Sequence, residues 1–105
     1  MHIQIVNFRL EGMGEEEYRG IAEAIAPAFS DLPGLVSKTW LANPQTGAYG
    51  GVYVWQSREA MEAYKETDIY RGIGTNPHFA DLVVKDFAVL EGPTRVTRGP
   101  VEAAV

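Results

Sequence analysis

The chain contains 105 residues, of which 9 are Lys or Arg and 14 are Asp or Glu, so its formal net charge is −5. This length suits one domain with a single hydrophobic core. The absence of cysteine excludes disulfides, thiolate metal sites and a cysteine nucleophile. A negative charge with scattered basic residues repels a phosphate backbone, so we expect no nucleic-acid partner.

Targeting and membrane signals are missing from the sequence. Residues 1–30 carry neither the basic region nor the continuous apolar stretch of a signal peptide. The chain contains no uninterrupted apolar run of the length that a membrane-spanning helix needs. We therefore expect a cytoplasmic protein with no membrane partner.

The first predicted element is a strand at residues 2–10. Apolar residues occupy both alternating phases of this segment, which indicates that both faces of the strand are covered. We expect the phase of Ile5 and Asn7 to face the helices. The phase of Val6 and Phe8 would then face the opposite side of the sheet.

A helix is predicted at residues 15–31, because carboxylates stand at its start and apolar residues recur at helical spacing. Pro27 inside this segment predicts a kink or an early end near Ala26. Two β-rich segments follow at residues 35–42 and 51–56. The Pro- and Gly-rich turn between them indicates a hairpin.

The second half of the chain predicts one more helix and one more strand. Ser57 is a suitable N-cap for the second helix, and residues 69–72 predict a further helical turn. Residues 81–91 predict the last strand. One domain therefore spans residues 1–95, and residues 96–105 form a C-terminal tail that is either disordered or extended across a neighbour.

This order of elements, β-α-β-β-α-β, predicts a ferredoxin-like α+β fold. It consists of a four-stranded antiparallel sheet with helices on one face. The other face of the sheet would expose a broad apolar surface to water. A second copy of the chain is the simplest cover for it, so we expect a two-fold homodimer.

The sequence gives no support for metal or nucleotide binding. His2 and His78 are the only histidines, and neither has a second ligand at a metal-binding spacing. Gly50 and Gly51 follow a hairpin turn rather than opening a helix after a strand, so they do not form a phosphate-binding loop. We therefore expect neither a bound metal nor a cofactor.

Three residues are candidates for the lining of a pocket between the sheet and the helices. Asn7 either lines this pocket or is satisfied by neighbouring backbone groups. Trp55 stands where a strand ends and the second helix begins, which is typical of a pocket rim and equally of a core tryptophan. Tyr64 lies in the apolar stripe of that helix, so packing alone also explains it.

Further aromatic and charged residues are candidates for binding a small apolar or aromatic ligand. Trp40 and Tyr53 share a face of the sheet if the hairpin pairs them directly, whereas a shift by one residue separates them. Tyr70, Arg71 and His78 follow the second helix, where a loop could close over a pocket. His78 is either an exposed loop residue or a general base.

Three short motifs stand in order before the second helix. They are Pro33-Gly34-Leu35, the pair of Lys38 and Trp40, and Gly50-Gly51-Val52-Tyr53. Together with the following helix and the strand at residues 81–91, they resemble the YdhR-like monooxygenases. This family is a branch of the antibiotic-biosynthesis-monooxygenase-like dimeric α+β barrels, and the resemblance covers residues 3 to 95.

The resemblance implies a homodimer whose sheets face each other, with a ligand pocket in each subunit between sheet and helices. Related quinol-type oxygenases and haem-degrading enzymes use an Asn on the first strand, a Trp at the end of the third strand and a His or Tyr on the next helix. Asn7, Trp55 and Tyr64 match these positions, which implies a catalytic role for them. Tyrosine replaces the axial histidine of the haem degraders, and a neutral phenol is a poorer axial ligand.

Three classes of function fit these observations. The first is a cofactor-independent monooxygenase for a small hydroxylated aromatic or polyketide-like compound, whose anion itself reduces dioxygen. The second is a non-catalytic small-molecule binder or structural dimer on the same scaffold, because fold alone does not determine function. The third is an isomerase or cyclase with His78 or Asp86 as the base. A haem-binding protein is a further alternative.

Overall fold

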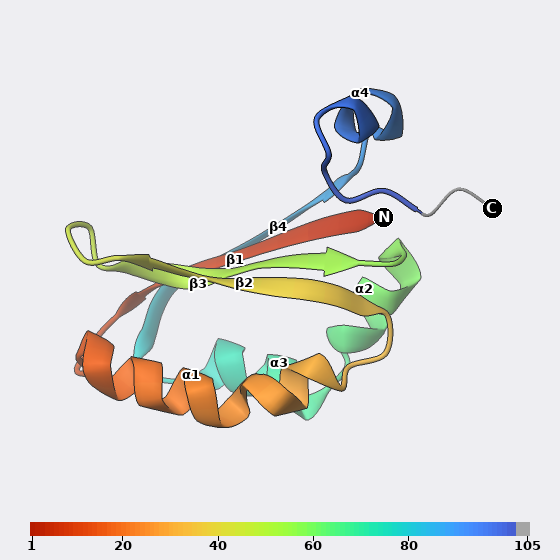
Figure 1. Ribbon diagram of the computed structural model, residues 1–105. Coiled ribbons are helices and arrows are strands. Elements are labelled where there is room, and N and C mark those ends of the chain that lie inside the picture. Colours follow the sequence, from red (N-terminus) through yellow and green to blue (C-terminus); the bar gives the residue numbers. More distant parts are fainter. Residues whose placement is uncertain (103–105) are drawn as a thin grey trace.

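The computed structural model describes residues 1–102. Four strands form one antiparallel sheet in the order β2-β3-β1-β4 (Figure 1). The strands are β1 (His2–Leu10), β2 (Leu35–Asn43), β3 (Ala48–Trp55) and β4 (Phe79–Ala88). The helices are α1 (Glu15–Ser30), α2 (Arg58–Tyr64), α3 (Asp68–Thr75) and α4 (Glu91–Val96).

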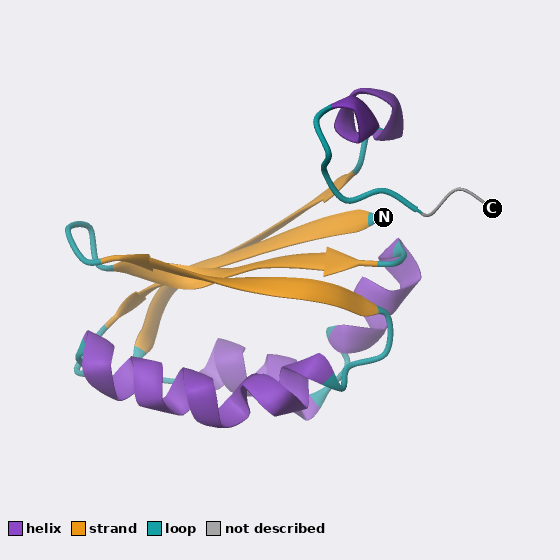
Figure 2. Ribbon diagram, in the orientation of Figure 1, coloured by secondary structure: helices purple, strands orange, loops and turns teal. Residues whose placement is uncertain are grey.

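The helices lie in two places relative to the sheet. Helices α1, α2 and α3 lie on one side of the sheet, whereas α4 lies on the other side, close to the N-terminus (Figures 1 and 2). This arrangement confirms the predicted ferredoxin-like α+β fold with its main helical layer on one face. We call the face away from α1, α2 and α3 the open face of the sheet. None of the helices described over residues 1–102 is long and apolar enough to cross a membrane.

The predicted orientation of β1 is wrong. Val6 and Phe8 are buried under the helices, with 2% and 6% of their surfaces exposed, whereas Asn7 is exposed. The phase of Ile5 and Asn7 therefore faces the open side. Both phases of this strand carry large apolar side chains, so hydrophobic alternation alone does not distinguish its two faces.

Helix α1 runs to Ser30, so the predicted early end near Ala26 is wrong. Pro27 lacks a backbone N–H and its ring crowds the preceding turn, but it lies in the last turn of the helix, where few residues follow it. The carbonyl of Pro27 still accepts from the backbone N–H of Asp31 over 3.2 Å. The final turn of α1 thus places Phe29 and Ser30 over strand β2.

Two hydroxyl caps position the helices that follow β3. The Ser57 hydroxyl accepts from the backbone N–H of Ala60, which confirms the predicted start of α2. Thr67 caps α3 in the same way through the N–H of Tyr70. Helix α3 continues to Thr75 and is therefore longer than the turn predicted at residues 69–72.

The hairpin pairs Lys38 with Tyr53 and Trp40 with Gly51, so the direct pairing of Trp40 with Tyr53 is wrong. Strand β3 also begins at Ala48, before the two glycines. The observed register differs from the predicted one by two residues, so Trp40 and Tyr53 still lie on the same face, because paired residues point to the same side of a sheet. Lys38, Trp40 and Tyr53 therefore all point toward the helices.

Helix α4 was not predicted from the sequence. In the structure Pro93 stands in the first turn of α4, where a backbone N–H has no helical acceptor and a proline costs little. Val96 is therefore helical rather than part of an extended tail. Residues 99–102 contain no helix or strand, and the rest of the predicted tail, residues 103–105, lies outside the described residues.

Candidate functional site

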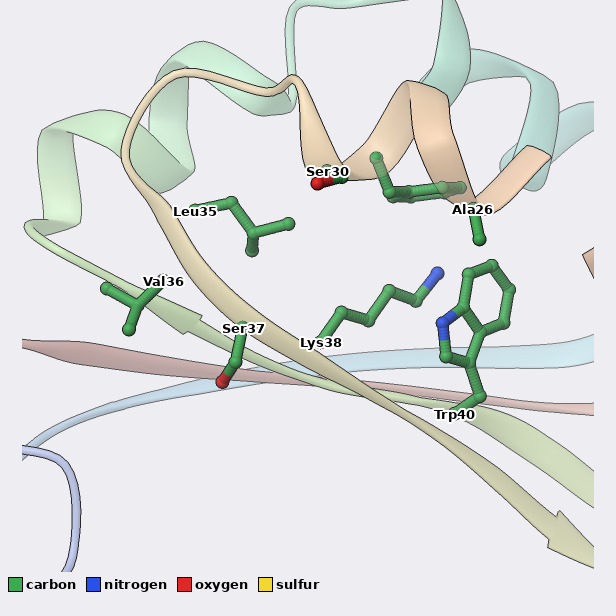
Figure 3. Close-up of a pocket in the computed structure, with 8 residues that line it drawn as sticks. Ala26, Ser30, Leu35, Val36, Ser37, Lys38 and Trp40 are labelled. Carbon is green, nitrogen blue, oxygen red and sulfur yellow. The ribbon is translucent and has the colours of Figure 1, made fainter. Parts of the chain in front are cut away.

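A cavity of about 310 Å³ lies between the C-terminal half of α1 and strand β2 (Figure 3). We call it the α1–β2 cavity. Its volume is at the lower end of the range for small-molecule sites. Its lining residues are Ala26, Phe29 and Ser30 from α1 and Leu35, Val36, Ser37, Lys38 and Trp40 from β2.

The polar centre of this cavity is the ammonium group of Lys38. Its Nζ lies 3.5 Å from the centre of the Phe29 ring and 3.4 Å from the centre of a Trp40 ring. The ring of Tyr53 is 4.7 Å away. Such contacts stabilise a cation through the negative faces of the rings. Among the salt bridges of residues 1–102, none involves Lys38, so aromatic faces stand where a carboxylate usually would.

Burial lowers the pKa of Lys38 from its ordinary value to about 7. The physical cause is the loss of hydration of the ammonium form among aromatic side chains. At neutral pH the side chain is therefore divided between a cationic ammonium and a nucleophilic, basic amine. Few lysines in proteins combine both states at this pH.

Glycine on the neighbouring strand makes room for the Lys38 side chain. A Cβ atom on Gly51 would lie 2.8 Å from Lys38 Cε and 3.3 Å from the Tyr53 ring. Gly51 is the cross-strand partner of Trp40. The glycine therefore allows the lysine stem to lie flat on the sheet and to reach Phe29 on α1.

A buried group of aromatic residues supports the floor of the cavity. Tyr53 is 1% exposed and stacks on Trp55, with an interplanar angle of 4° and ring centres 6.1 Å apart. The hydroxyl groups of Tyr53 and Tyr64 are 3.2 Å apart and share a hydrogen bond. Burial raises the pKa of Tyr64 to about 12 and raises the pKa of Tyr53 further, so both phenols are neutral at physiological pH.

The carboxamide beside Trp55 comes from Gln4 rather than from Asn7. The indole N–H of Trp55 donates to Gln4 Oε1 over 3.1 Å, and neither side chain has exposed surface. The Nε2 atom of Gln4 is buried and has no hydrogen-bond partner among residues 1–102. The expectation that Asn7 points between sheet and helices is thus wrong, because its side chain is on the open face.

The predicted catalytic residues Trp55 and Tyr64 do not line the α1–β2 cavity. They are 0% and 2% exposed and belong to the core. Under the centre of the sheet, around Phe8 and Tyr53, only about 30 Å³ is free. That space accommodates a water molecule rather than a ring. Of the predicted residues, Trp40 lines the α1–β2 cavity and Tyr53 lies beneath it.

The remaining candidates lie elsewhere. Tyr70 packs edge-on against Tyr64, with ring centres 5.2 Å apart. Arg71 is exposed and pairs with Asp68 on its own helix at 2.9 Å. His78 bonds through Nδ1 to the Glu11 carbonyl at 2.7 Å, at the end of the sheet opposite to Trp55. These three residues therefore do not meet in one site with Lys38.

Asp86, the other candidate base, is paired with a histidine. Its carboxylate lies 2.6 Å from Nε2 of His2. This hydrogen bond is the main reason that the pKa of Asp86 is lowered from its ordinary value. A carboxylate with a lowered pKa is a weak base near neutral pH, so this pair gives little support to an isomerase mechanism.

The donor groups around Trp55 and Tyr64 do not fit haem. The Tyr64 hydroxyl is engaged with Tyr53 and remains neutral, whereas a tyrosine ligand to haem iron is anionic. The side chains of Trp55, Met61 and Tyr64 fill the adjacent volume with at most 2% of their surfaces exposed. Within residues 1–102, no group of three or more His, Cys, Asp or Glu side chains is arranged to hold a metal ion.

Sequence reasoning missed Lys38 and Gln4 as functional candidates. The signal for Lys38 was present, because a lysine two residues before Trp40 shares its strand phase and must face the helices with it. Gln4 carried no local signal. Its partner Trp55 is 51 residues away in the sequence, so only the pairing of β1 with β3 brings them together.

Solved structures of about the same length share this fold. A "putative antibiotic biosynthesis monooxygenase" from Deinococcus radiodurans aligns with a TM-score of 0.72 and 17% identity, covering 88% of this chain and 95% of that one. The heme-degrader MhuD from Mycobacterium tuberculosis, solved with two hemes in its active site, aligns with a TM-score of 0.69 and 21% identity, covering 86% of this chain and 96% of that one. The N63A mutant of SnoaB, a cofactor-independent oxygenase from Streptomyces nogalater, aligns with a TM-score of 0.67 and 19% identity, covering 86% of this chain and 94% of that one. None of the curated proteins matches the sequence.

The four-stranded sheet and its helical layer thus define a ferredoxin-like α+β protein, and the solved structure described as a putative antibiotic biosynthesis monooxygenase shares this fold. At the level of sequence the assignment is narrower. The chain belongs to the family described as "Putative mono-oxygenase ydhR", which it matches over residues 3–100. The resemblance drawn from the motifs around Lys38, Trp40 and Gly51 is confirmed.

Proposed function

We propose that this protein is a cofactor-independent monooxygenase that oxidises a small hydroxylated aromatic or polyketide-like compound in the α1–β2 cavity. One observation carries the proposal. A lysine with a pKa of about 7 lies among aromatic rings in a cavity that admits a small ring compound. Membership in a monooxygenase family supports the reaction class.

The proposed reaction needs no external reductant. Loss of a proton from a phenol or enol gives an anion that donates an electron to dioxygen. The resulting radical and superoxide combine to form a carbon–oxygen bond. At a methylene carbon, the peroxide then loses water, so that CH₂ and O₂ become C=O and H₂O. The four electrons that reduce dioxygen come from the substrate.

In this proposal Lys38 is the catalytic residue. Its amine takes the acidic proton of the substrate, and the ammonium so formed pairs with the substrate anion. The apolar surroundings strengthen this attraction relative to water. The rings of Phe29 and Trp40 hold the substrate ring beside Nζ and exclude water.

The roles expected for Trp55 and Tyr64 become positioning roles in this proposal. Trp55 stacks on the Tyr53 ring, and the hydroxyl of Tyr64 is hydrogen-bonded to the hydroxyl of Tyr53. Together they set the ring of Tyr53 beneath Lys38. Gln4 orients the Trp55 indole in turn, in the place proposed from the sequence for Asn7.

The test is dioxygen uptake with a panel of naphthols, hydroquinones and hydroxylated anthrones. Product mass under isotopically heavy dioxygen should show the gain of one oxygen atom. The Lys38→Met variant should lose about 100-fold in kcat/KM, the scale of general base catalysis, whereas Lys65→Met should retain full activity. Equal activity of Lys38→Met and the parent protein would refute this role for Lys38.

The second candidate is a non-catalytic binder of small aromatic compounds. It is favoured by the burial of Trp55 and Tyr64, which leaves the residues suggested by the family resemblance out of contact with the cavity. Calorimetric binding of panel compounds without any oxygen uptake or product would support this candidate over the monooxygenase.

We further propose that a second copy of the chain covers the open face of the sheet. Large apolar side chains are exposed there, with Val83 at 47% and Phe87 at 50%. Phe87 pairs with Ile3 and Val83 pairs with Asn7, which places all four residues on this face. A self-complementary apolar face suits a two-fold homodimer.

A further inference from the structure

We infer that Lys38 is a covalent attachment site, at which its amine condenses with a small aromatic aldehyde or ketone held in the α1–β2 cavity. This activity does not depend on the proposed oxygenation. The inference rests on the position of Nζ in the cavity, on the aromatic walls beside it and on the groups that surround it.

The surroundings of Lys38 keep its amine available as a nucleophile. In the part of the chain that the structure describes, no carboxylate lines the cavity and holds the side chain as an ammonium. The titratable side chains that share the buried space beside Lys38 are the phenols of Tyr53 and Tyr18, and burial raises the pKa of each above the ordinary value, so both stay neutral. A desolvated lysine in an apolar pocket is the usual form of an imine-forming residue.

The cavity also offers room and orientation for a carbonyl compound. Its volume of about 310 Å³ lies next to Nζ, and the faces of Phe29 and Trp40 can stack on an aromatic ring. Ser30 of α1 also lines this space. A serine hydroxyl is a suitable partner for the oxygen that leaves during condensation. Figure 3 shows the Lys38 side chain leaving β2 toward α1 and ending beside the Trp40 ring.

The proposed step balances without an oxidant or reductant. The lone pair of the Nζ amine attacks the carbonyl carbon, and the carbonyl oxygen gains a proton to give a carbinolamine. The carbinolamine then loses water, and a carbon–nitrogen double bond forms. The products are the imine and one water molecule, so the reaction is reversible and the apolar cavity favours the dehydrated form.

The chain supplies its own comparison groups, since Lys65 and Lys85 are its only other lysines. Lys65 ends α2, and Lys85 lies on the open face opposite Ile5. Among the described residues, neither lysine has an aromatic ring at the distances found for Lys38. Lys65 therefore reports the reactivity of a lysine outside both the cavity and the proposed dimer face, and Lys85 reports that of a lysine on the open face.

The experiment is reductive trapping with 4-hydroxybenzaldehyde and cyanoborohydride at neutral pH, followed by peptide mass mapping. We expect the Lys38 peptide to be labelled at least tenfold faster than the Lys65 and Lys85 peptides. Unfolding in urea should make the three rates equal. Equal rates in the folded protein, or label on Lys65 and Lys85 alone, would overturn the inference.

Two variants guard against loss of folding. Lys38→Arg keeps a cation but has no imine-forming amine, and it should abolish the fast labelling while circular dichroism stays unchanged. Trp40→Ala keeps the amine and removes one wall, and it should slow the labelling of Lys38 toward the rate of Lys65. Unchanged fast labelling in Lys38→Arg would assign the reaction to another site.

Labelling under anaerobic conditions separates this inference from the proposed oxygenation. An imine that forms at Lys38 without dioxygen supports covalent capture, whatever the outcome of the uptake assay. If the protein consumes dioxygen but Lys38 is not labelled selectively, the proposed monooxygenase function stands and the inference of covalent capture at Lys38 is refuted.

Discussion

The side chain of Lys38 lies directly over Gly51, where a Cβ atom would be only 2.8 Å from Lys38 Cε. The two residues are on neighbouring strands, and Gly51 is paired with Trp40. The absence of a side chain at Gly51 thus decides where the lysine can lie. The adjacent Gly50 has a different role, so the glycine pair provides two contrasting tests.

Gly51→Ala should displace the lysine without unfolding the protein. The atom in conflict is near the end of a flexible side chain, so the free energy of unfolding should change by about 1 kcal/mol or less. Displacement toward water should raise the pKa of Lys38 toward its ordinary value. Side-chain NMR titration of the three lysines measures this. Gly72→Ala, where nothing lies within 4 Å, is the control; an unchanged Lys38 titration in Gly51→Ala would contradict the packing described.

Gly50→Ala should be far more damaging. The backbone of Gly50 has φ of 150°, and a Cβ atom there would lie 1.8 Å from the Val6 carbonyl oxygen. This neighbour is backbone in the adjacent strand and cannot move alone. We expect a loss of more than about 3 kcal/mol of unfolding free energy, or failure to fold. Urea denaturation beside Gly51→Ala tests the contrast, and equal stability of the two variants would refute it.

Stability should rise with pH above neutrality because of Lys38. Its folded pKa is about 7, whereas the unfolded chain keeps the ordinary value near 10.5. Between these values the unfolded state binds more protons, so the free energy of unfolding increases by at most about 1.4 kcal/mol per pH unit. Above pH 10 the raised pKa of the buried Tyr53 and Tyr64 acts in the opposite direction, since the unfolded phenols lose their protons first.

The measurement is urea unfolding between pH 6 and pH 9.5 for the parent protein and for Lys38→Met. The variant should lack this lysine-dependent slope and should be more stable than the parent near pH 6, where burial of the ammonium costs most. Parallel pH profiles for the two proteins would show that Lys38 titrates normally in the folded state.

The hydrogen bond between Trp55 and Gln4 should appear as a coupling energy. Trp55→Phe removes the indole N–H and leaves the buried amide of Gln4 without any partner. Gln4→Leu removes that amide. In a double-mutant cycle the two losses should be less than additive, with a coupling of about 1 kcal/mol. Additive losses in urea denaturation would mean that the bond contributes nothing net.

Charge on the open face should disrupt the proposed homodimer. Phe87→Glu places a carboxylate at a half-exposed apolar position and should convert a dimer to a monomer in sedimentation experiments. Ile25→Glu, at a 41% exposed position on α1, is the control and should leave the dimer intact. A parent protein that sediments as a monomer at micromolar concentration would contradict the proposal.

The order of the elements follows from local sequence signals. Ser57 caps α2 through a residue three positions away, and turn residues mark the hairpin between β2 and β3. Such signals act over a few residues and are readable without tertiary contacts. The end of α1 and the presence of α4 were not predicted correctly, because the energetic cost of Pro27 or Pro93 depends on which turn of the helix the proline occupies.

The candidate site was less predictable because it depends on register and facing. Val6 and Ile5 are both apolar, so the choice of buried phase in β1 depends on what the rest of the fold places above it. Lys38 becomes a cavity residue only when α1 supplies Phe29 above it. These are contacts between segments far apart in the chain, which a single sequence does not reveal.

The two tryptophans experience very different surroundings. Trp55 has no exposed surface and is hydrogen-bonded to Gln4, whereas Trp40 is partly exposed and lies against an amine that changes its charge near neutral pH. Emission from Trp55 should therefore follow the integrity of the core, and emission from Trp40 should follow the occupancy and protonation of the cavity. The molecule thus contains two intrinsic optical reporters, one for folding and one for ligand capture.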